Sequence, residues 1–247
     1  MTENRVVSKK GPVVAIDGPA GTGKSSTAKR LSKELGFIHV DTGAMYRSVA
    51  LAALDKQIVT PEILRVEGDL DSAIEKKVVA LAKEIQIEFR YDDNRTPTNR
   101  VIANGLDVTD RIRSPEVSLA ASKTSAFPGV RTALLGMQRS LGCTGKTILE
   151  GRDIGTVIFP DAEIKFFLTA NVEERAKRRL SEMELSGQDT PSFEEVKQQI
   201  SERDHADSSR ATAPLMKADD AIEIDTSKYT LDEVVAKMKK IVQDRLA

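Results

Sequence analysis

The sequence contains few of the residues that form disulfide bonds or bind zinc. Its single cysteine, Cys143, excludes an internal disulfide and is typical of a reducing compartment. The two histidines, His39 and His205, are far apart in the sequence, and with one cysteine they give no zinc-ligand spacing. A disulfide-stabilised fold and a zinc module are therefore excluded. We expect Cys143 to be incidental rather than catalytic, because no histidine is near it in the sequence.

Long hydrophobic runs and an excess of one charge are also absent. No run approaches the roughly 18 apolar residues that a membrane span needs. The first residues, MTENRVVSKKGP, lack the long apolar segment of a signal peptide. The formal net charge of −1 gives no general attraction to nucleic acid or to an anionic membrane, so any basic site must be local. We therefore expect a soluble, cytoplasmic protein that binds neither nucleic acid nor membranes.

What is present at the start of the chain is a regular alternation of strands and helices. The apolar runs VVAID at 13–17 and FIHV at 37–40 are typical of buried strands. Residues 25–35 and 43–54 carry apolar side chains at helical spacing. This order predicts an α/β fold with a doubly wound parallel sheet. A length of 247 residues suits one large domain, or one domain with an insertion.

The middle of the chain interrupts this order. A helical pattern at 71–85 is followed by strand patterns within 85–93 and 99–109, with a turn signal at Asn104-Gly105. We predict a flexible tail at 1–11, a small α/β insertion with antiparallel strands at 60–112, and a core domain made of 12–59 and 113–247. Further helices are expected at 114–126, 128–141, 172–186, 192–205 and 230–245, and further strands at 146–150, 163–169 and 221–225.

The stretch GPAGTGKS, residues 18–25, matches the phosphate-binding pattern G-x-x-x-x-G-K-S/T between a strand and a helix. Its glycines allow backbone torsions and a close approach that a Cβ would block, and N–H groups of the loop and of the helix N-terminus face an anion. Lys24 is placed for the β/γ-phosphates and the Ser25 hydroxyl for Mg²⁺. A plain glycine turn is the alternative, but the strand, spacing, Lys and Ser together favour nucleotide binding. The expected ATP-binding residues here are Gly18, Pro19, Ala20, Gly21, Thr22, Gly23, Lys24, Ser25 and Ser26.

A phosphate-binding loop does not by itself identify a reaction. The N-K-x-D run that reads guanine in GTPases does not occur, and the strand KTILE leads into Glu150-Gly151-Arg152-Asp153 rather than the paired acids typical of motor ATPases. Arg152 and Asp153 follow the carboxyl end of a parallel strand, where ligands bind in such sheets. A guanidinium group there is suited to a second phosphate. Arg152 therefore suggests a phosphorylated acceptor.

The segment DTGAMYR, residues 41–47, suggests the same kind of ligand. Asp41 and Thr42 end a strand and cap the next helix, and Arg47 lies one and a half turns into it. Thr42 and Arg47 could donate a hydroxyl and a guanidinium to an anion at the helix start. A plain capped helix with a surface arginine explains the pattern equally well.

Two arginine-rich helical faces occur later in the chain. Arg203, Asp207 and Arg210 share one face, and so do the arginines at 175, 178 and 179. Each run could be a solvated, salt-bridged surface. Their position on both sides of a Gly/Pro break favours a mobile lid at about 175–210, because lid arginines stabilise phosphoryl transfer and a closed lid excludes water.

The sequence resembles bacterial-type cytidylate kinases from about residue 12 to its C-terminus. The matching segments, in order, are IDGPAGTGKSSTAKRL, DTGAMYR, SKTSAFPGVR, EGRDIGTVIFPDAEIKFFLTANVEERAKRR, ERDHADSSRATAPL and ADDAIEID. The resemblance implies a P-loop NTPase three-layer fold with a parallel five-stranded sheet, a lid, and the insertion for the acceptor nucleotide. It also implies a monomer that uses ATP with Mg²⁺ to phosphorylate CMP and dCMP in pyrimidine nucleotide metabolism. A kinase of another small acceptor and a nucleotide-binding regulator without turnover are the alternatives.

The resemblance also implies roles for individual residues. Arg47 and Arg152 resemble the pair that binds the acceptor phosphate, with Thr42 beside them. Ser122, Arg131 and Asp153 resemble the cytosine readers, and a carboxylate accepting from the exocyclic amine disfavours uracil. Asp207 corresponds to a ribose partner, Arg203 and Arg210 to residues that bridge the phosphates, and Arg178 to an arginine on the ATP side. The lid has Ala206 and Ser208 where some relatives have arginines, which leaves fewer cations.

These inferences together define the predicted site. The expected catalytic residues are Lys24, Arg152, Asp153, Arg203 and Arg210. The expected CMP-binding residues are Thr42, Arg47, Ser122, Arg131, Arg152, Asp153, Arg203 and Asp207. The ATP-binding residues listed above are completed by Arg178, and Ser25 is the expected metal ligand.

Overall fold

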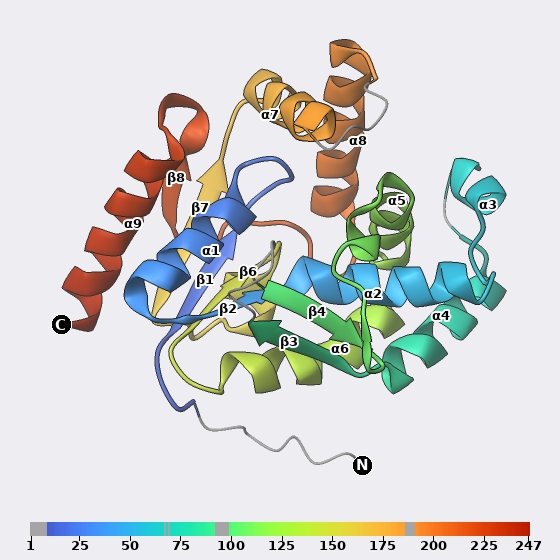
Figure 1. The fold of residues 1–247 in the computed structure, drawn as a ribbon, viewed down its shortest axis with the longest axis horizontal. Helices are drawn as coiled ribbons and strands as arrows, with labels where there is room; N and C mark the ends of the chain where they lie inside the picture. Colours follow the sequence, from blue (N-terminus) through green and yellow to red (C-terminus); the bar gives the residue numbers. More distant parts are fainter. Residues whose placement is uncertain (1–8, 67, 69, 92–98, 186–190) are drawn as a thin grey trace. The chain divides into compact units, whose positions relative to one another are not determined.

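The computed structural model describes residues 9–66, 68, 70–91, 99–185 and 191–247 (Figure 1). The chain forms two compact units. The first unit consists of Met1–Val40 and Arg139–Ala247, and the second unit of Asp41–Gln138. The insertion expected at 60–112 lies inside the second unit, and most of the tail expected at 1–11 lies outside the described residues.

A five-stranded parallel sheet organises the first unit, as predicted. Its order is β2-β6-β1-β7-β8, and β1 pairs in parallel with both β6 and β7. All five residues of β1 are buried, which is why this strand is an uninterrupted apolar run ending in one acid. The strands are β1 (Val13–Asp17), β2 (Ile38–Asp41), β6 (Thr147–Glu150), β7 (Ile164–Thr169) and β8 (Ile222–Asp225). Because β6, β1 and β7 are neighbours, the segments that follow them emerge at one edge of the sheet.

Helices α1 (Lys24–Leu35) and α9 (Leu231–Leu246) pack against one face of this sheet and contact each other (Figure 1). Their buried residues, including Leu31 and Met238, form one cluster with Phe166 of β7. Helix α1 ends where Gly36 adopts a left-handed conformation, with φ of 67°. This packing holds the N-terminus of α1, and therefore the loop before it, on a rigid support.

The expected lid segment forms two packed helices, α7 (Val172–Leu185) and α8 (Phe193–Ser209), with the break at 186–190 outside the described residues. Ala176 of α7 packs against Val196 and Ile200 of α8. Helix α8 ends four residues beyond the expected position, and this extension carries Asp207 on regular helix. Two short elements were not predicted: a π-helix, η2 (Ile154–Ile158), and a 3₁₀ turn, η3 (Thr226–Lys228).

The second unit contains the predicted antiparallel strands. They form a three-stranded sheet in the order β3-β4-β5, where β3 is Ile87–Tyr91, β4 is Asn99–Ala103 and β5 is Leu106–Asp107. Asn104 and Gly105 both have positive φ, of 49° and 80°, which is the conformation of a tight two-residue hairpin turn. The helical elements are α2 (Thr42–Asp55), α3 (Pro61–Arg65), α4 (Ser72–Glu84), η1 (Arg111–Arg113), α5 (Pro115–Thr124) and α6 (Pro128–Gly142), whose last turn belongs to the first unit.

Helix α2 contacts both α4 and α5, so it is central to the second unit. The short helix α3 was not predicted, because five residues are too few for a periodic pattern. None of the helices in the described part of the chain is long and apolar enough to cross a membrane.

Candidate active site

The loop between β1 and α1 requires glycine at the predicted positions. Gly18, Gly21 and Gly23 have φ values of 143°, 76° and 81°. A Cβ on Gly18 would lie 2.1 Å from the carbonyl oxygen of Leu168, so no larger residue fits. Gly23 is the N-cap of α1 and provides no side-chain cap. The first turn of α1 therefore presents its N–H groups without a capping side chain, which is the arrangement that binds phosphate.

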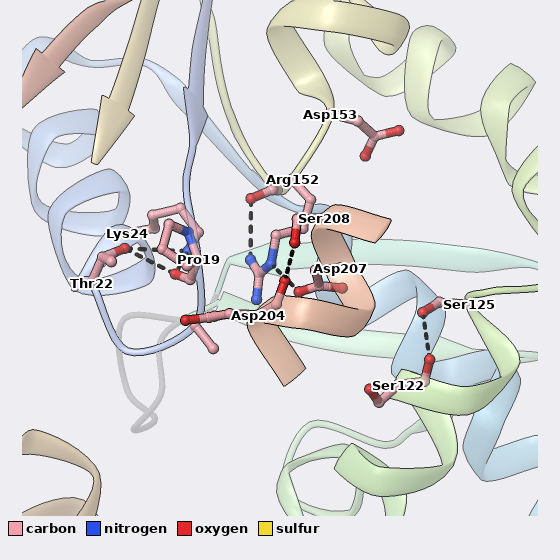
Figure 2. Close-up of polar contacts among 12 residues, drawn as sticks. Pro19, Thr22, Lys24, Ser122, Ser125, Arg152, Asp153, Asp204, Asp207 and Ser208 are labelled. Carbon is pink, nitrogen blue, oxygen red and sulfur yellow. Dashed lines mark hydrogen bonds and ion pairs between the residues drawn. The ribbon is translucent and has the colours of Figure 1, made fainter. Parts of the chain in front are cut away.

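Lys24 is buried in this loop, with 6 % of its surface exposed. Its Nζ donates to the carbonyl oxygen of Pro19 at 2.6 Å and to Oγ1 of Thr22 at 3.4 Å (Figure 2). Burial lowers the pKa of Lys24 well below its usual value, and the positive charges of Arg152 and Arg203 lower it further. A buried ammonium group among other cations is stabilised by an anionic ligand. The loop therefore has both the shape and the charge of a phosphate site.

Ser25 is held by a buried acid that follows a neighbouring strand. Its Oγ donates to Oε2 of Glu150 at 2.6 Å, and Nε2 of His39 lies 2.9 Å from Oε1 of the same carboxylate. Glu150 is the last residue of β6 and is only 3 % exposed. Because the Ser25 proton points toward Glu150, the lone pairs of Ser25 are turned away from it. The pair offers hard oxygen donors of the kind Mg²⁺ prefers.

Arg152 and Asp207 form an ion pair between the β6 edge and helix α8. Arg152 Nε donates to Oδ2 of Asp207 at 2.8 Å (Figure 2). Arg210 lies 3.5 Å from the other Asp207 oxygen and 4.0 Å from Oδ1 of Asp153. Burial pushes the pKa of Asp207 upward, but the charges of Arg152, Arg203 and Arg210 hold it below its usual value. Four residues predicted for the site are thus connected through one anionic carboxylate.

The π-helix that directly follows Arg152 and Asp153 is fixed at both of its ends. Asp17, the last residue of β1, accepts from the backbone N–H groups of Ile154 at 2.9 Å and Gly155 at 2.7 Å. Arg139 donates to the carbonyl oxygens of Ile158 and Val157, both at 3.1 Å. These bonds explain why a π-helix forms directly after Asp153. Arg152 and Asp153 are therefore presented by a rigid turn rather than by a free loop.

Asp17 should make the folded protein less stable as pH rises, because its pKa is raised rather than lowered. Burial raises its pKa from 3.8 to about 6, more than the bonds from Gly155 and Ile154 lower it. Between these values the folded state binds more protons than the unfolded state, so the contribution of Asp17 to stability falls as pH rises from about 4 to about 6. Relative to Asp17→Asn, the wild type should lose roughly 1 to 1.5 kcal/mol of unfolding free energy between about pH 5 and pH 7.5. Urea unfolding of both proteins measures this difference, and parallel pH profiles would contradict the raised pKa.

The arginines of α7 contact the phosphate loop and η3. Arg175 is buried, and its Nη1 donates to the carbonyl oxygen of Ala20 at 3.1 Å and to Oδ2 of Asp204 at 2.5 Å. Arg178 donates to the carbonyl oxygen and to Oγ1 of Thr226, at 2.8 and 3.0 Å. Arg203 lies on α8 one turn before Asp207, and its charge acts on both Asp207 and Lys24.

In the second unit, Arg47 is paired with the acid that caps its own helix. Asp41 accepts from the N–H of Ala44 at 2.9 Å, and its other oxygen accepts from Arg47 at 2.7 Å. Asp41 is the N-cap of α2, whereas Thr42 is the buried first residue of the helix rather than part of the cap. The capping bond thus orients Asp41, and Asp41 orients Arg47 across the first turn.

Ser122 and Arg131 are connected to each other through Ser125. Arg131 donates to the carbonyl oxygen of Ser125 at 3.3 Å. Oγ of Ser125 donates to the carbonyl oxygen of Ser122 at 3.1 Å (Figure 2). The guanidinium carbon of Arg131 lies 5.2 Å from the centroid of the Tyr46 ring, within the range of a cation–π interaction. Only 6 % of Arg131 is exposed. Tyr46 therefore helps to fix the orientation of Arg131.

Several of these residues were missed from the sequence. Glu150 could have been found, because it ends a buried strand, at the carboxyl edge where ligands bind in parallel sheets. The roles of the others depend on contacts between elements that no local pattern indicates. These residues are His39, Tyr46, Arg175 and Thr226.

Known proteins similar to this chain point to one family. The model of a family described as cytidylate kinase matches residues 14–244. A cytidylate kinase of Geobacter sp. (strain M21) is 46 % identical over 242 residues, which cover 98 % of this chain and 97 % of the relative. One of Syntrophotalea carbinolica is 43 % identical, covering 94 % of this chain and 92 % of the relative. A bifunctional pantoate ligase/cytidylate kinase of Gloeobacter violaceus is 44 % identical over 95 % of this chain, which spans 43 % of that relative.

Proposed function

The chain belongs to the cytidylate kinase family and is a phosphotransferase, and we propose that it transfers the γ-phosphate of ATP to CMP and dCMP with Mg²⁺ as cofactor. The observation that carries the donor assignment is Lys24, a buried ammonium group in a glycine loop whose pKa is lowered by burial and by two nearby arginines. Such a group is stabilised when an anion enters the loop. Triphosphate binding supplies that anion.

The phosphate loop binds the donor in this proposal. The N–H groups of residues 18–26 bind the β- and γ-phosphates, and Lys24 exchanges its bond to the Pro19 carbonyl for a bond to a phosphate oxygen. Ser25 and Glu150 fit Mg²⁺, because Ser25 offers a hydroxyl oxygen already oriented by a buried carboxylate. When bound, Mg²⁺ neutralises charge on the phosphate oxygens. Arg178 belongs to the donor side in this proposal, and it also donates to the carbonyl oxygen and to Oγ1 of Thr226.

The proposal assigns the acceptor to the residues that the family resemblance implies. Arg47 and Arg152 bind the phosphate of CMP, since each is a partly buried guanidinium already paired with a carboxylate that holds it in place. Thr42 adds a hydroxyl. Ser122, Arg131 and Asp153 bind the cytosine ring, and Asp207 binds the ribose while it retains Arg152.

Transfer proceeds by in-line attack. An oxygen of the CMP phosphate forms a bond to the γ-phosphorus as the bond from that phosphorus to the β–γ bridging oxygen breaks, and ADP leaves with the bond's electrons. Positioning and positive charge do most of the catalysis, because the attacking oxygen is already anionic. Lys24, Arg203 and Arg210 stabilise the charge on the transferred group, and Arg152 holds the attacking phosphate.

The proposal is tested by the choice of acceptor. We expect ATP-dependent ADP release with CMP and dCMP, and much slower release with UMP, AMP, GMP or dTMP. Equal rates with all acceptors, or no rate with CMP, would contradict it. ATP binding without turnover on any monophosphate would favour a regulatory protein instead.

Asp153→Asn should reduce selectivity for CMP over UMP by at least about 10-fold, mainly through slower reaction with CMP. A carboxylate accepts a hydrogen bond from the cytosine amine, whereas the carbonyl of uracil at that place would face its negative charge. The measurement is kcat/KM for both acceptors. Asp161→Asn, at an exposed acid of the same segment, is the matched control and should leave both values unchanged. If Asp153→Asn lowers both equally, Asp153 does not read the base.

A further inference from the structure

The phosphate loop can turn its N–H groups toward a ligand only if its carbonyl groups point away from that ligand. In a trans peptide the C=O of one residue and the N–H of the next point in opposite directions. Fixing a carbonyl in the loop therefore aims the next N–H. Three loop carbonyls, those of Pro19, Ala20 and Thr22, accept bonds from side chains of the first unit.

The first carbonyl is held from within the loop. Pro19 accepts from Lys24 and from Thr22. Since Lys24 also has to bind phosphate, the bond from the Thr22 hydroxyl at 3.1 Å remains when the lysine leaves. This support is part of the loop itself and needs no other element.

The second carbonyl is held by helix α7. Arg175 donates to Ala20 and at the same time pairs with Asp204 of α8. The Cβ of Arg175 also lies 3.1 Å from the position that a Cβ on Gly21 would occupy, so Arg175 packs directly against the loop. Its bond to the Ala20 carbonyl turns the N–H of Gly21 to the opposite side.

The third carbonyl is held by η3, which follows the last strand of the sheet. Oγ1 of Thr226 lies 3.1 Å from the carbonyl oxygen of Thr22 and 3.1 Å from that of Thr169. The same oxygen accepts from Arg178. Thr226 is only 3 % exposed, and its hydroxyl has both its donor and its acceptor capacity in use. Its contact with Thr22 turns the N–H of Gly23 away from η3, at the N-terminus of α1.

We propose that Thr226, supported by Arg178, and Arg175 are positioning residues that aim the N–H groups of Gly23 and Gly21 at the phosphates of the donor nucleotide. This inference rests on the proposed function only in taking the loop as the donor site. None of the three side chains needs to touch the nucleotide. Their effect is to keep the loop in its binding conformation before the ligand arrives, so that binding does not have to order it.

The test compares two substitutions of one hydroxyl. Thr226→Val keeps the shape of the side chain and removes the hydroxyl, whereas Thr226→Ser keeps the hydroxyl and removes a methyl group. We expect Thr226→Val to raise the Kd for ADP and the KM for ATP at least about 10-fold, the effect of one misdirected buried hydrogen bond. Thr226→Ser should stay within about 3-fold of wild type, and the KM for CMP should change little in either. Titration calorimetry with ADP and initial-rate kinetics supply the values.

Two outcomes would overturn the proposal. Equal ADP affinity in Thr226→Val and Thr226→Ser would show that the hydroxyl does not position the loop. A parallel rise in the KM for ATP and for CMP would show general loosening of the fold instead. If Thr226→Val does not fold, Arg175→Met decides in its place, because methionine keeps an apolar stem and removes the Nη1 group that donates to both Ala20 and Asp204. It should weaken ADP binding at least about 5-fold, and unchanged binding would overturn the proposal. ADP binding is measured without an acceptor, so a wrong assignment of CMP leaves this test intact.

Discussion

Lys24→Met is expected to lower kcat at least about 10³-fold, or roughly 4 kcal/mol in the activation barrier. In the proposed mechanism, the buried ammonium group of Lys24 moves from the Pro19 carbonyl to the transferred phosphate. Methionine preserves the length and the apolar stem of the side chain. The loss therefore reports the charge and its hydrogen bonds rather than a cavity.

The control for this substitution is Lys29→Met on the same helix. Lys29 is exposed, so its replacement should leave kcat and both KM values unchanged. Thermal unfolding without ligand gives a second check on Lys24→Met. Because burial of an ammonium group costs free energy, Lys24→Met should be no less stable than wild type without ligand. A small change in kcat for Lys24→Met would contradict the role given to the loop.

The regular elements of this protein follow from its sequence wherever the pattern is local. VVAID and TILE are buried strands because most of their side chains are apolar on both faces. Asn104-Gly105 forms a tight turn because both residues accept positive φ. The π-helix at Ile154–Ile158 has no such local cause. Its backbone N–H groups donate to Asp17 and its carbonyl groups accept from Arg139, and both of these residues belong to other elements of the fold.

The candidate site also contains residues that a local pattern predicts and residues that only a contact between distant segments reveals. The phosphate loop is one contiguous segment, so its residues, its glycine torsions and its lysine could all be predicted. The pairing of Arg152 with Asp207 joins residues 55 positions apart, and helical spacing alone could show only that Asp207 shares a face with two arginines. Thr226 lies 204 positions from the carbonyl it contacts, in a segment without a recognisable motif. Residues that position other residues are the least visible in a sequence, because their role is defined by a contact and not by a pattern.

Arg152→Ala should lower kcat/KM for CMP about 10³-fold or more while the KM for ATP stays within about 3-fold of wild type. The guanidinium binds the acceptor phosphate in the proposed mechanism, so its loss removes both binding and alignment of the attacking oxygen. Arg47→Ala should show the same pattern, a steep rise in the KM for CMP with ATP binding retained. Arg179→Ala, at an exposed arginine paired only weakly with Glu182, is the matched control and should have no effect.

The alternative to acceptor binding is that Arg152 serves only to neutralise the charge of Asp207. The charge of Arg152 is the largest of the effects that hold the pKa of Asp207 down, so its removal alters that carboxylate as well. A double-mutant cycle with Asp207→Asn separates the two roles. If Arg152 only neutralises Asp207, then Asp207→Asn should restore activity to Arg152→Ala. If Arg152 binds the acceptor phosphate, the double variant should remain about as slow as Arg152→Ala, since no other change returns a guanidinium to that phosphate. We expect the second result, with CMP and dCMP affected alike by Arg152→Ala, because both carry the same phosphate.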